Sequence, residues 1–294
     1  MTGAGGLIGT ALTRRLKDAG HEVIPLVRDK EAAKGGAIYW DPYENIIEKE
    51  RLEGFDGVVH LSGENLAERW SDEKKRKIRE SRIRTTSLLS ETLAALENPP
   101  EVFVSASAIG IYGDRGDEIL TEESSPGKGF LADVTREWEE ASKGLERTHI
   151  RQVNLRIAMV LSSNGGALEK MLPAFKTGVG GKIGSGEQYV SWIAIDDLTR
   201  IFEFVLTNKN ISGAVNAVSP NPVTNQKFTE ALAEALGRPS FATVPAIAIK
   251  MIFGEMGKAT VLSSTRAIPE KLKGAGFEFQ FPDIETALGA VLGK

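Results

Sequence analysis

Residues 1–10 read MTGAGGLIGT, and within them Gly3, Gly6 and Gly9 stand three residues apart. In a doubly wound sheet, the first strand-to-helix turn carries a dinucleotide on three such glycines. One makes the tight turn, one lets backbone N–H groups approach the pyrophosphate, and one lets helix and strand pack closely. Residues 7–18 have the spacing of an amphipathic helix, and Gly20 can cap it. The stretch therefore predicts a dinucleotide site, with a simple structural turn as the alternative.

Short apolar runs alternate with helical stretches along the rest of the chain. Strands are predicted over 21–29, 37–40, 57–63, 101–108, 151–161, 190–197 and 213–219, helices over 71–96, 131–146, 225–237 and 243–256, and a loop over 179–188. This alternation predicts an α/β fold with a Rossmann-type doubly wound parallel sheet. We expect a nucleotide-binding domain over 1–161, to which strands from about 190–219 return. Residues 162–294 should form mainly a smaller, mostly helical substrate lobe, interleaved with the first domain.

The first strand of such a sheet is central, yet only Met1 and Thr2 precede Gly3. A strand needs about five residues, and each buried backbone group left unpaired costs about 1–3 kcal/mol. Losing a central strand would rival the whole stability of a typical domain, roughly 5–15 kcal/mol. We therefore expect the natural chain to begin a few residues upstream, with a short run of Val, Ile or Leu.

The end of the second predicted strand distinguishes NADP from NAD. An acidic residue there accepts hydrogen bonds from a ribose 2′-OH, whereas an arginine suits a 2′-phosphate. The run VIPLV ends at Arg28, whose planar guanidinium can grip a phosphate. Asp29 is the rival candidate, one residue further on. The position of Arg28 favours NADP.

The composition narrows the functional class. The 294 residues carry a formal net charge of -4 and no cysteine, which argues against a nucleic-acid partner and excludes disulfides and thiolate metal sites. His21, His60 and His149 are too scattered for a metal motif. We see no signal peptide and no apolar run of membrane-spanning length. A soluble, cytoplasmic protein with a small-molecule substrate, and no nucleic-acid or membrane partner, is expected.

Arg82 lies on the apolar face of the helix predicted over 71–96. Ile78, Thr85 and Leu89 stand at the spacings that share one helical face with it. An inward-facing arginine needs an anionic partner. Two partners stay open: a buried carboxylate, or the cofactor or an anionic substrate.

These features resemble the extended short-chain dehydrogenase/reductase superfamily. The closest resemblance is to its atypical "epimerase family" branch of NADP-binding proteins, which is similar to NAD-dependent epimerase/dehydratases. Some members of this branch carry cell-division-inhibitor names. The resemblance rests on TGAGGLIG (2–9), Arg28, YWDP (39–42), HLSGEN (60–65), SRIRTT (81–86), SASAIGIYG (105–113), GFLADVTREWE (129–139), GSGEQYVSWI (184–193) and GAVNAVSP (213–220).

The resemblance implies bound NADP(H) and a substrate cleft under the C-terminal lobe. It favours the cofactor as the partner of Arg82, and it implies that Val27 and Arg28 lie at the adenosine phosphate. The cofactor-binding residues predicted in this way are Gly3, Gly6, Leu7, Ile8, Gly9, Val27, Arg28, Leu61, Ser62, Gly63 and Arg82.

The usual chemistry of this superfamily needs a tyrosine with a lysine four residues later. None of the four tyrosines has one, and the corresponding positions hold Leu131 and Thr135. The serine position is retained at Ser107, which is either a catalytic or substrate-positioning group or a strand-end residue that caps backbone. Tyr112 is the first candidate for a substitute acid. Further candidates are Asp133 and Lys128.

Two functions stay open. The first is an NADP-dependent oxidoreductase or epimerase-like enzyme that acts on a small carbonyl or hydroxyl substrate without the Tyr–Lys pair. The second is a non-catalytic NADP(H)-sensing or regulatory binding protein, with a link to cell division. The stretch GGKIGSGEQYVSWI (180–193) either closes over a substrate, with Lys182, Gln188 and Trp192 facing it, or is a flexible connection.

Overall fold

A computed structural model describes residues 1–293. Its main sheet has four parallel strands in the order β12 (Gly213–Ala217), β7 (Arg151–Ile157), β5 (Val102–Ala108) and β4 (Gly57–His60). Beyond β4, Thr2 bridges in parallel to His60 and to Leu26 of β1 (Leu26–Val27). β1 pairs in parallel with β2 (Ile38–Asp41), and the antiparallel β3 (Ile46–Ile47) pairs with β2. The predicted α/β fold with a parallel Rossmann-type sheet is confirmed.

Two residues hold the place expected for the first strand. The backbone N–H of Thr2 donates to Val59 O at 2.9 Å, and that of Leu26 donates to Met1 O at 2.8 Å. Met1 and Thr2 thus connect β4 to β1 through backbone bonds on both sides. The upstream apolar run stays a prediction.

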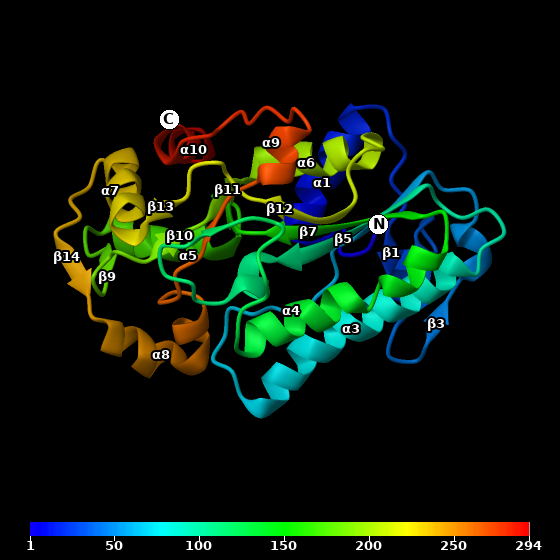
Figure 1. Cartoon of the computed structure of the whole chain (residues 1–294), viewed down its shortest axis with the longest axis horizontal. Coiled ribbons are helices and arrows are strands. Elements are labelled where there is room, and N and C mark those ends of the chain that lie inside the picture. Colours follow the sequence, from blue (N-terminus) through cyan, green and yellow to red (C-terminus); the bar gives the residue numbers. More distant parts are fainter. Residues whose placement is uncertain (294) are drawn as a thin grey trace.

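Helices cover both faces of the sheet (Figure 1). α1 (Leu7–Asp18) and α6 (Ile195–Thr207) lie on one face, and α3 (Asp72–Ala94) and α4 (Phe130–Glu140) on the other. Successive strand residues point to opposite faces. Accordingly, Val59 and Val104 pack in the cluster that contains α1 and α6, whereas Val58 and Phe103 pack with α3. The sheet is buried on both sides.

The smaller lobe gathers around a second apolar cluster. It draws on α5 (Gly166–Lys176), α7 (Asn225–Leu236) and α10 (Ile284–Val291). Three two-stranded pairs surround it: β8 (Met159–Leu161) with β11 (Trp192–Ala194), β9 (Gly181–Ile183) with β14 (Ala242–Val244), and β10 (Tyr189–Val190) with β13 (Val223–Thr224). The remaining elements are α2 (Lys30–Ala33), α8 (Ala246–Ala259), α9 (Glu270–Gly274), β6 (Ile119–Leu120), β15 (Arg266–Ala267), η1 (Lys49–Leu52), η2 (Ile109–Tyr112) and η3 (Lys143–Arg147). The domain boundary at residue 161 stays a prediction.

Several predicted elements differ from those observed. The strand expected over 190–197 ends at Ala194, and α6 begins at once, because Asp196 and Asp197 place carboxylates in the positively charged first turn of a helix. The strand over 151–161 breaks at Ala158 into β7 and β8. The helix over 131–146 ends at Glu140, before η3. The predicted loop 179–188 contains β9. Within residues 1–293, no helix is long and apolar enough to cross a membrane.

Candidate functional site: two cavities at the carboxyl edge of the sheet

Two glycines of the glycine turn, Gly3 and Gly9, have no room for a side chain. Gly3 has a positive φ of 66°, and a Cβ there would lie 2.9 Å from the backbone carbon of Leu61. A Cβ at Gly9 would lie 2.2 Å from Gly3 O, which also accepts the N–H of Gly6 at 3.1 Å. The first turn of α1 holds no acidic residue and its N-cap is a glycine without a side-chain cap. Its positive end is therefore available to an anion.

A cavity of about 250 Å³ opens beside this turn, and we call it the glycine cavity. It is lined by Gly3, Gly6, Arg28, Trp40, Tyr43, Leu61, Ser62, Gly63, Glu64, Ser81 and Thr85. Six of these residues were predicted as cofactor contacts. The other five predicted residues, which do not line it, are Leu7, Ile8, Gly9, Val27 and Arg82.

The sequence analysis missed the cavity-lining roles of five residues. Trp40 lies in the YWDP stretch, and Ser81 and Thr85 lie close to the inward face that Arg82 marks. Glu64 falls in the HLSGEN stretch, so only Tyr43 lies outside every stretch singled out.

Arg28 and Asp29 have different tasks. Arg28 is exposed on the wall of the glycine cavity and forms no ion pair within residues 1–293. The Asp29 carboxylate accepts the backbone N–H of Glu31 at 2.9 Å and thereby caps α2. The Asp29 carboxylate, the alternative partner for the ribose, is thus engaged by a backbone N–H group. The Arg28 guanidinium has no such partner in the described part of the chain and can bind a phosphate.

A buried histidine supports the floor of the glycine cavity. Burial lowers the pKa of His60 to about 3, so the ring is neutral at physiological pH. The Thr85 hydroxyl donates to Ser81 O at 2.6 Å, so it must accept from His60 Nε2, at 3.1 Å. His60 Nδ1 then accepts the Thr2 hydroxyl at 2.7 Å, and that hydroxyl in turn accepts the N–H groups of Leu61 and Ser62. The neutral Nε2–H tautomer of His60 therefore fixes, through Thr2, the backbone of Leu61 and Ser62, which line the cavity.

Arg82 is buried behind the same wall. Its guanidinium donates to the carbonyl oxygens of Glu64 and Ile78 and lies over the Trp138 ring, 5.0 Å from its centroid. A Cβ at Gly63 would lie 3.4 Å from it. Burial lowers the pKa of Arg82 to about 10. Of the two predicted partners, a carboxylate ion pair is not formed within residues 1–293, and contact with a bound ligand stays a prediction.

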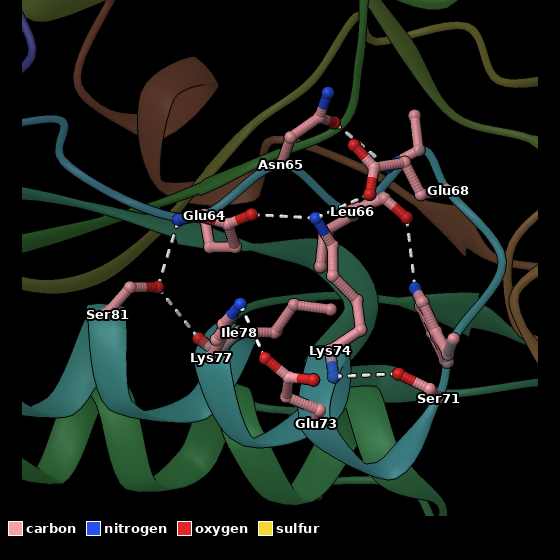
Figure 2. Close-up of polar contacts among 12 residues, drawn as sticks. Glu64, Asn65, Leu66, Glu68, Ser71, Glu73, Lys74, Lys77, Ile78 and Ser81 are labelled. Carbon is pink, nitrogen blue, oxygen red and sulfur yellow. Dashed lines mark hydrogen bonds and ion pairs between the residues drawn. The ribbon is translucent and has the colours of Figure 1, made fainter.

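The segment that follows β4 is fastened to the first turns of α3 (Figure 2). The N–H of Glu64 donates to Ser81 Oγ at 2.9 Å, and Lys74 Nζ bridges the carboxylates of Glu64 and Glu68 at 2.7 and 2.8 Å. Lys74 neutralises a carboxylate that would otherwise repel an anion in the glycine cavity. Further on, Arg69 donates to Met251 O of α8 at 3.2 Å. The segment therefore runs from the glycine cavity to the C-terminal lobe.

A second cavity of about 590 Å³, which we call the lobe cavity, lies where α4, α8 and the 183–188 segment meet. Leu131 lines it at the tyrosine position, and the Thr135 hydroxyl at the lysine position donates to Leu131 O at 2.7 Å. Lys128 also lines it, whereas Asp133 pairs with Arg136 on the helix surface.

The three residues of the 180–193 stretch that were expected to face a substrate lie in different surroundings. Gln188 lines the lobe cavity, but Lys182 does not. Trp192 is fully buried in the core of the smaller lobe, where its indole N–H donates to Asn221 O, so its predicted place facing a substrate is wrong.

Ser107 and Tyr112 belong to a buried polar network that lines neither cavity. The Ser107 hydroxyl donates to Glu139 at 2.6 Å, and Glu139 forms a bidentate ion pair with Arg156. Arg156 donates to the Tyr112 hydroxyl at 2.9 Å, and that hydroxyl donates to Asn216 at 2.7 Å. Burial raises the pKa of Tyr112 above its ordinary value, which keeps the phenol protonated. A catalytic role for either residue stays a prediction, and neither residue lines one of the two cavities.

Comparison with known proteins decides the family. The model of the NAD dependent epimerase/dehydratase family matches residues 1–217, from the glycine turn to the end of β12. This chain belongs to that family. A domain of unknown function (DUF1731) matches residues 244–291, which contain α8, α9 and α10.

Relatives of this epimerase-family chain match it along nearly its whole length. Epimerase family protein Mb2239 of Mycobacterium bovis is 39% identical over 290 residues, which cover 98% of this chain and 95% of the relative. The crystal structure of human epimerase family protein SDR39U1 (isoform 2) with NADPH is 32% identical, with a TM-score of 0.91 over 99% of this chain and 98% of that one. A nucleoside-diphosphate sugar epimerase from Corynebacterium glutamicum is 41% identical, with a TM-score of 0.81, and this chain covers 57% of it.

Proposed function

We propose that this chain binds NADPH in the glycine cavity and reduces a small carbonyl compound, or oxidises the matching alcohol, in the lobe cavity. The observation that carries the NADPH proposal is the free Arg28 guanidinium on the cavity wall, beside an Asp29 carboxylate that caps α2. A guanidinium recognises a 2′-phosphate, which NADPH has and NADH lacks. The human relative solved with NADPH supports this choice.

The two cavities lie where one extended cofactor can serve both. Ser62 and Gly63 follow β4, Gly110 follows β5, and the strands are neighbours in parallel register, with His60 opposite Ser105. Ligands of such sheets bind across the carboxyl ends of the strands. With its adenosine phosphate at Arg28 and its pyrophosphate at the glycine turn, NADPH would extend its nicotinamide toward the lobe cavity.

The reaction must proceed without the Tyr–Lys pair. Leu131 presents only an apolar side chain, and the Thr135 hydroxyl is occupied by a carbonyl. Of the predicted substitutes Tyr112, Asp133 and Lys128, only Lys128 lines the lobe cavity. We therefore take Lys128 as the first candidate for the group that faces the substrate oxygen.

A non-catalytic NADP(H) sensor is the second candidate function. It is favoured by the same Leu131 and Thr135, and by the engagement of Ser107 with Glu139. In this alternative the lobe cavity holds a ligand whose binding depends on the redox state of the cofactor. Cytoplasmic location belongs to both proposals, and neither includes a nucleic-acid or membrane partner.

Consumption of NADPH distinguishes an oxidoreductase from a non-catalytic sensor. NADPH-loaded protein is mixed with a panel of aldehydes, ketones and 2-oxo acids, and the loss of NADPH absorbance is followed. An oxidoreductase consumes NADPH with at least one compound, and Lys128→Met slows that reaction more than it weakens NADPH binding. Tight NADPH binding without consumption by any compound favours the sensor. Absence of NADPH binding overturns both proposals.

A further inference from the structure

The charged groups around the lobe cavity are unevenly paired. Its wall carries Lys128, two residues before α4, and Lys250 and Lys258 on α8. None of these lysines forms an ion pair in the described part of the chain, residues 1–293. All three are exposed, so their ammonium groups can reach a ligand at the mouth of the cavity.

The two carboxylates on the same wall are already engaged. Glu255 pairs with Lys75, which reaches it from α3. Asp114 accepts the backbone N–H of Ser264 at 3.2 Å and that of Gly116 at 3.5 Å. Lys75 offsets the charge of Glu255, whereas Asp114 keeps its negative charge, so within residues 1–293 three unpaired lysines on the wall face one uncompensated carboxylate. The lining residues therefore carry a net positive charge, which attracts anions.

Much of the remaining wall is apolar. Phe130 and Leu131 line it from α4, Ile183 from β9, and Ala246 and Leu262 from α8 and the turn after it. A volume of about 590 Å³ suits a small molecule, since ligand cavities commonly measure roughly 300–1,000 Å³. Apolar walls with a few polar groups bind the body of a ligand by burial and fix its orientation through its charge.

We propose that the lobe cavity takes a small amphipathic anion: a carboxylate or a phosphate monoester attached to an apolar body. Lys250 and Lys258 hold the anionic group, and the walls formed by α4 and β9 cover the apolar part. This assignment rests on the proposed function in one respect only, because the nicotinamide of NADPH would adjoin the apolar body. It differs from a nucleoside-diphosphate sugar, whose body is polar throughout.

Matched probes of one chain length test the charge. Hexanoate, hexyl phosphate and 1-hexanol are titrated calorimetrically into the full chain, with and without NADPH. We expect at least one anion to bind about tenfold or more tightly than 1-hexanol. The double variant Lys250→Gln/Lys258→Gln should reduce this preference to about threefold or less, since it removes both ammonium groups assigned to the anion while keeping side chains of similar length. Comparing hexanoate with hexyl phosphate decides between the two anions.

Two controls test whether the anion preference depends on the cavity lysines and whether their replacement affects NADPH binding. Lys273→Gln removes an exposed lysine of α9 that lines neither cavity and should leave all three titrations unchanged. NADPH affinity should also be unchanged in the double variant. Equal binding of 1-hexanol and both anions, an unaltered preference in the double variant, or tighter binding of UDP-glucose than of any probe overturns the inference. Anion binding without NADPH binding contradicts the proposed function and leaves this inference standing.

Discussion

Replacing Gly9 by alanine tests how the glycine turn is built. The added Cβ would lie 2.2 Å from Gly3 O, 2.7 Å from Ala4 Cα and 2.9 Å from Ala4 C. All three are backbone atoms, so no rotation of a side chain can relieve the overlap. The turn must move away from α1 by roughly 1 Å to restore an ordinary contact.

The size of the effect follows from that displacement. Forcing an extra carbon into a packed site costs about 1–3 kcal/mol of unfolding free energy. Gly3 O also holds the N–H of Gly6, at 3.1 Å, so the same shift disturbs the backbone that faces the glycine cavity. We expect NADPH affinity to fall about tenfold or more, which corresponds to at least about 1.4 kcal/mol.

Gly5→Ala is the matched control within the same turn. Gly5 is exposed, and no atom lies within 4 Å of its added Cβ. Its effect on unfolding should stay within about 0.5 kcal/mol, with NADPH affinity unchanged. Urea unfolding and calorimetric NADPH titration measure both quantities. Equal NADPH affinity in Gly9→Ala, Gly5→Ala and the unaltered chain would refute the close approach of turn and helix.

Two further predictions concern buried polar groups. The unfolded chain protonates His60 near its ordinary pKa of 6.5, whereas the folded chain does so only near 3, so stability is lost as pH falls between these values. From pH 7.5 to 4.5, the unaltered chain should therefore lose about 2–3 kcal/mol more unfolding free energy than His60→Gln, and parallel pH profiles in urea titrations would contradict this. Tyr112→Phe removes the hydroxyl that accepts from Arg156 and donates to the buried Asn216 Oδ1, so we expect a loss of about 1–3 kcal/mol in unfolding free energy. NADPH affinity should be unchanged, and a stable variant that loses turnover alone would restore Tyr112 as a catalytic group.

The local sequence pattern predicted those features that depend on a single helix or strand. The apolar spacing of residues 7–18 predicts α1 with its observed bounds, and the helical face shared with Ile78 predicts that Arg82 is buried. The end of the second strand singled out Arg28, which lines the glycine cavity, and its contact with a 2′-phosphate stays a prediction. Each of these predictions depends on neighbours within about two helical turns or one strand.

Contacts between residues far apart in the chain could not be predicted from the local sequence pattern. Tyr112 follows β5 like a residue of the site, but Arg156 and Asn216, which lie 44 and 104 residues further on, bind its hydroxyl inside the core. Trp192 was similarly expected to face a substrate, but the residues of the smaller lobe that bury it come from distant segments. α6 was missed although Leu198, Ile201, Phe202 and Val205 have helical spacing, because the apolar run before them was interpreted as one longer strand.

The most direct test of the account is a calorimetric comparison of NADPH and NADH. We predict that the unaltered chain binds NADPH more tightly and that Arg28→Ala weakens NADPH by roughly tenfold to a hundredfold, the equivalent of a charge-assisted bond of about 1.5–3 kcal/mol. NADH affinity should barely change. Arg84→Ala, which removes an exposed arginine that lines neither cavity, should leave both affinities unchanged. Equal affinity of the unaltered chain for the two cofactors, or equal losses for both in Arg28→Ala, would contradict the assignment of Arg28 to the 2′-phosphate.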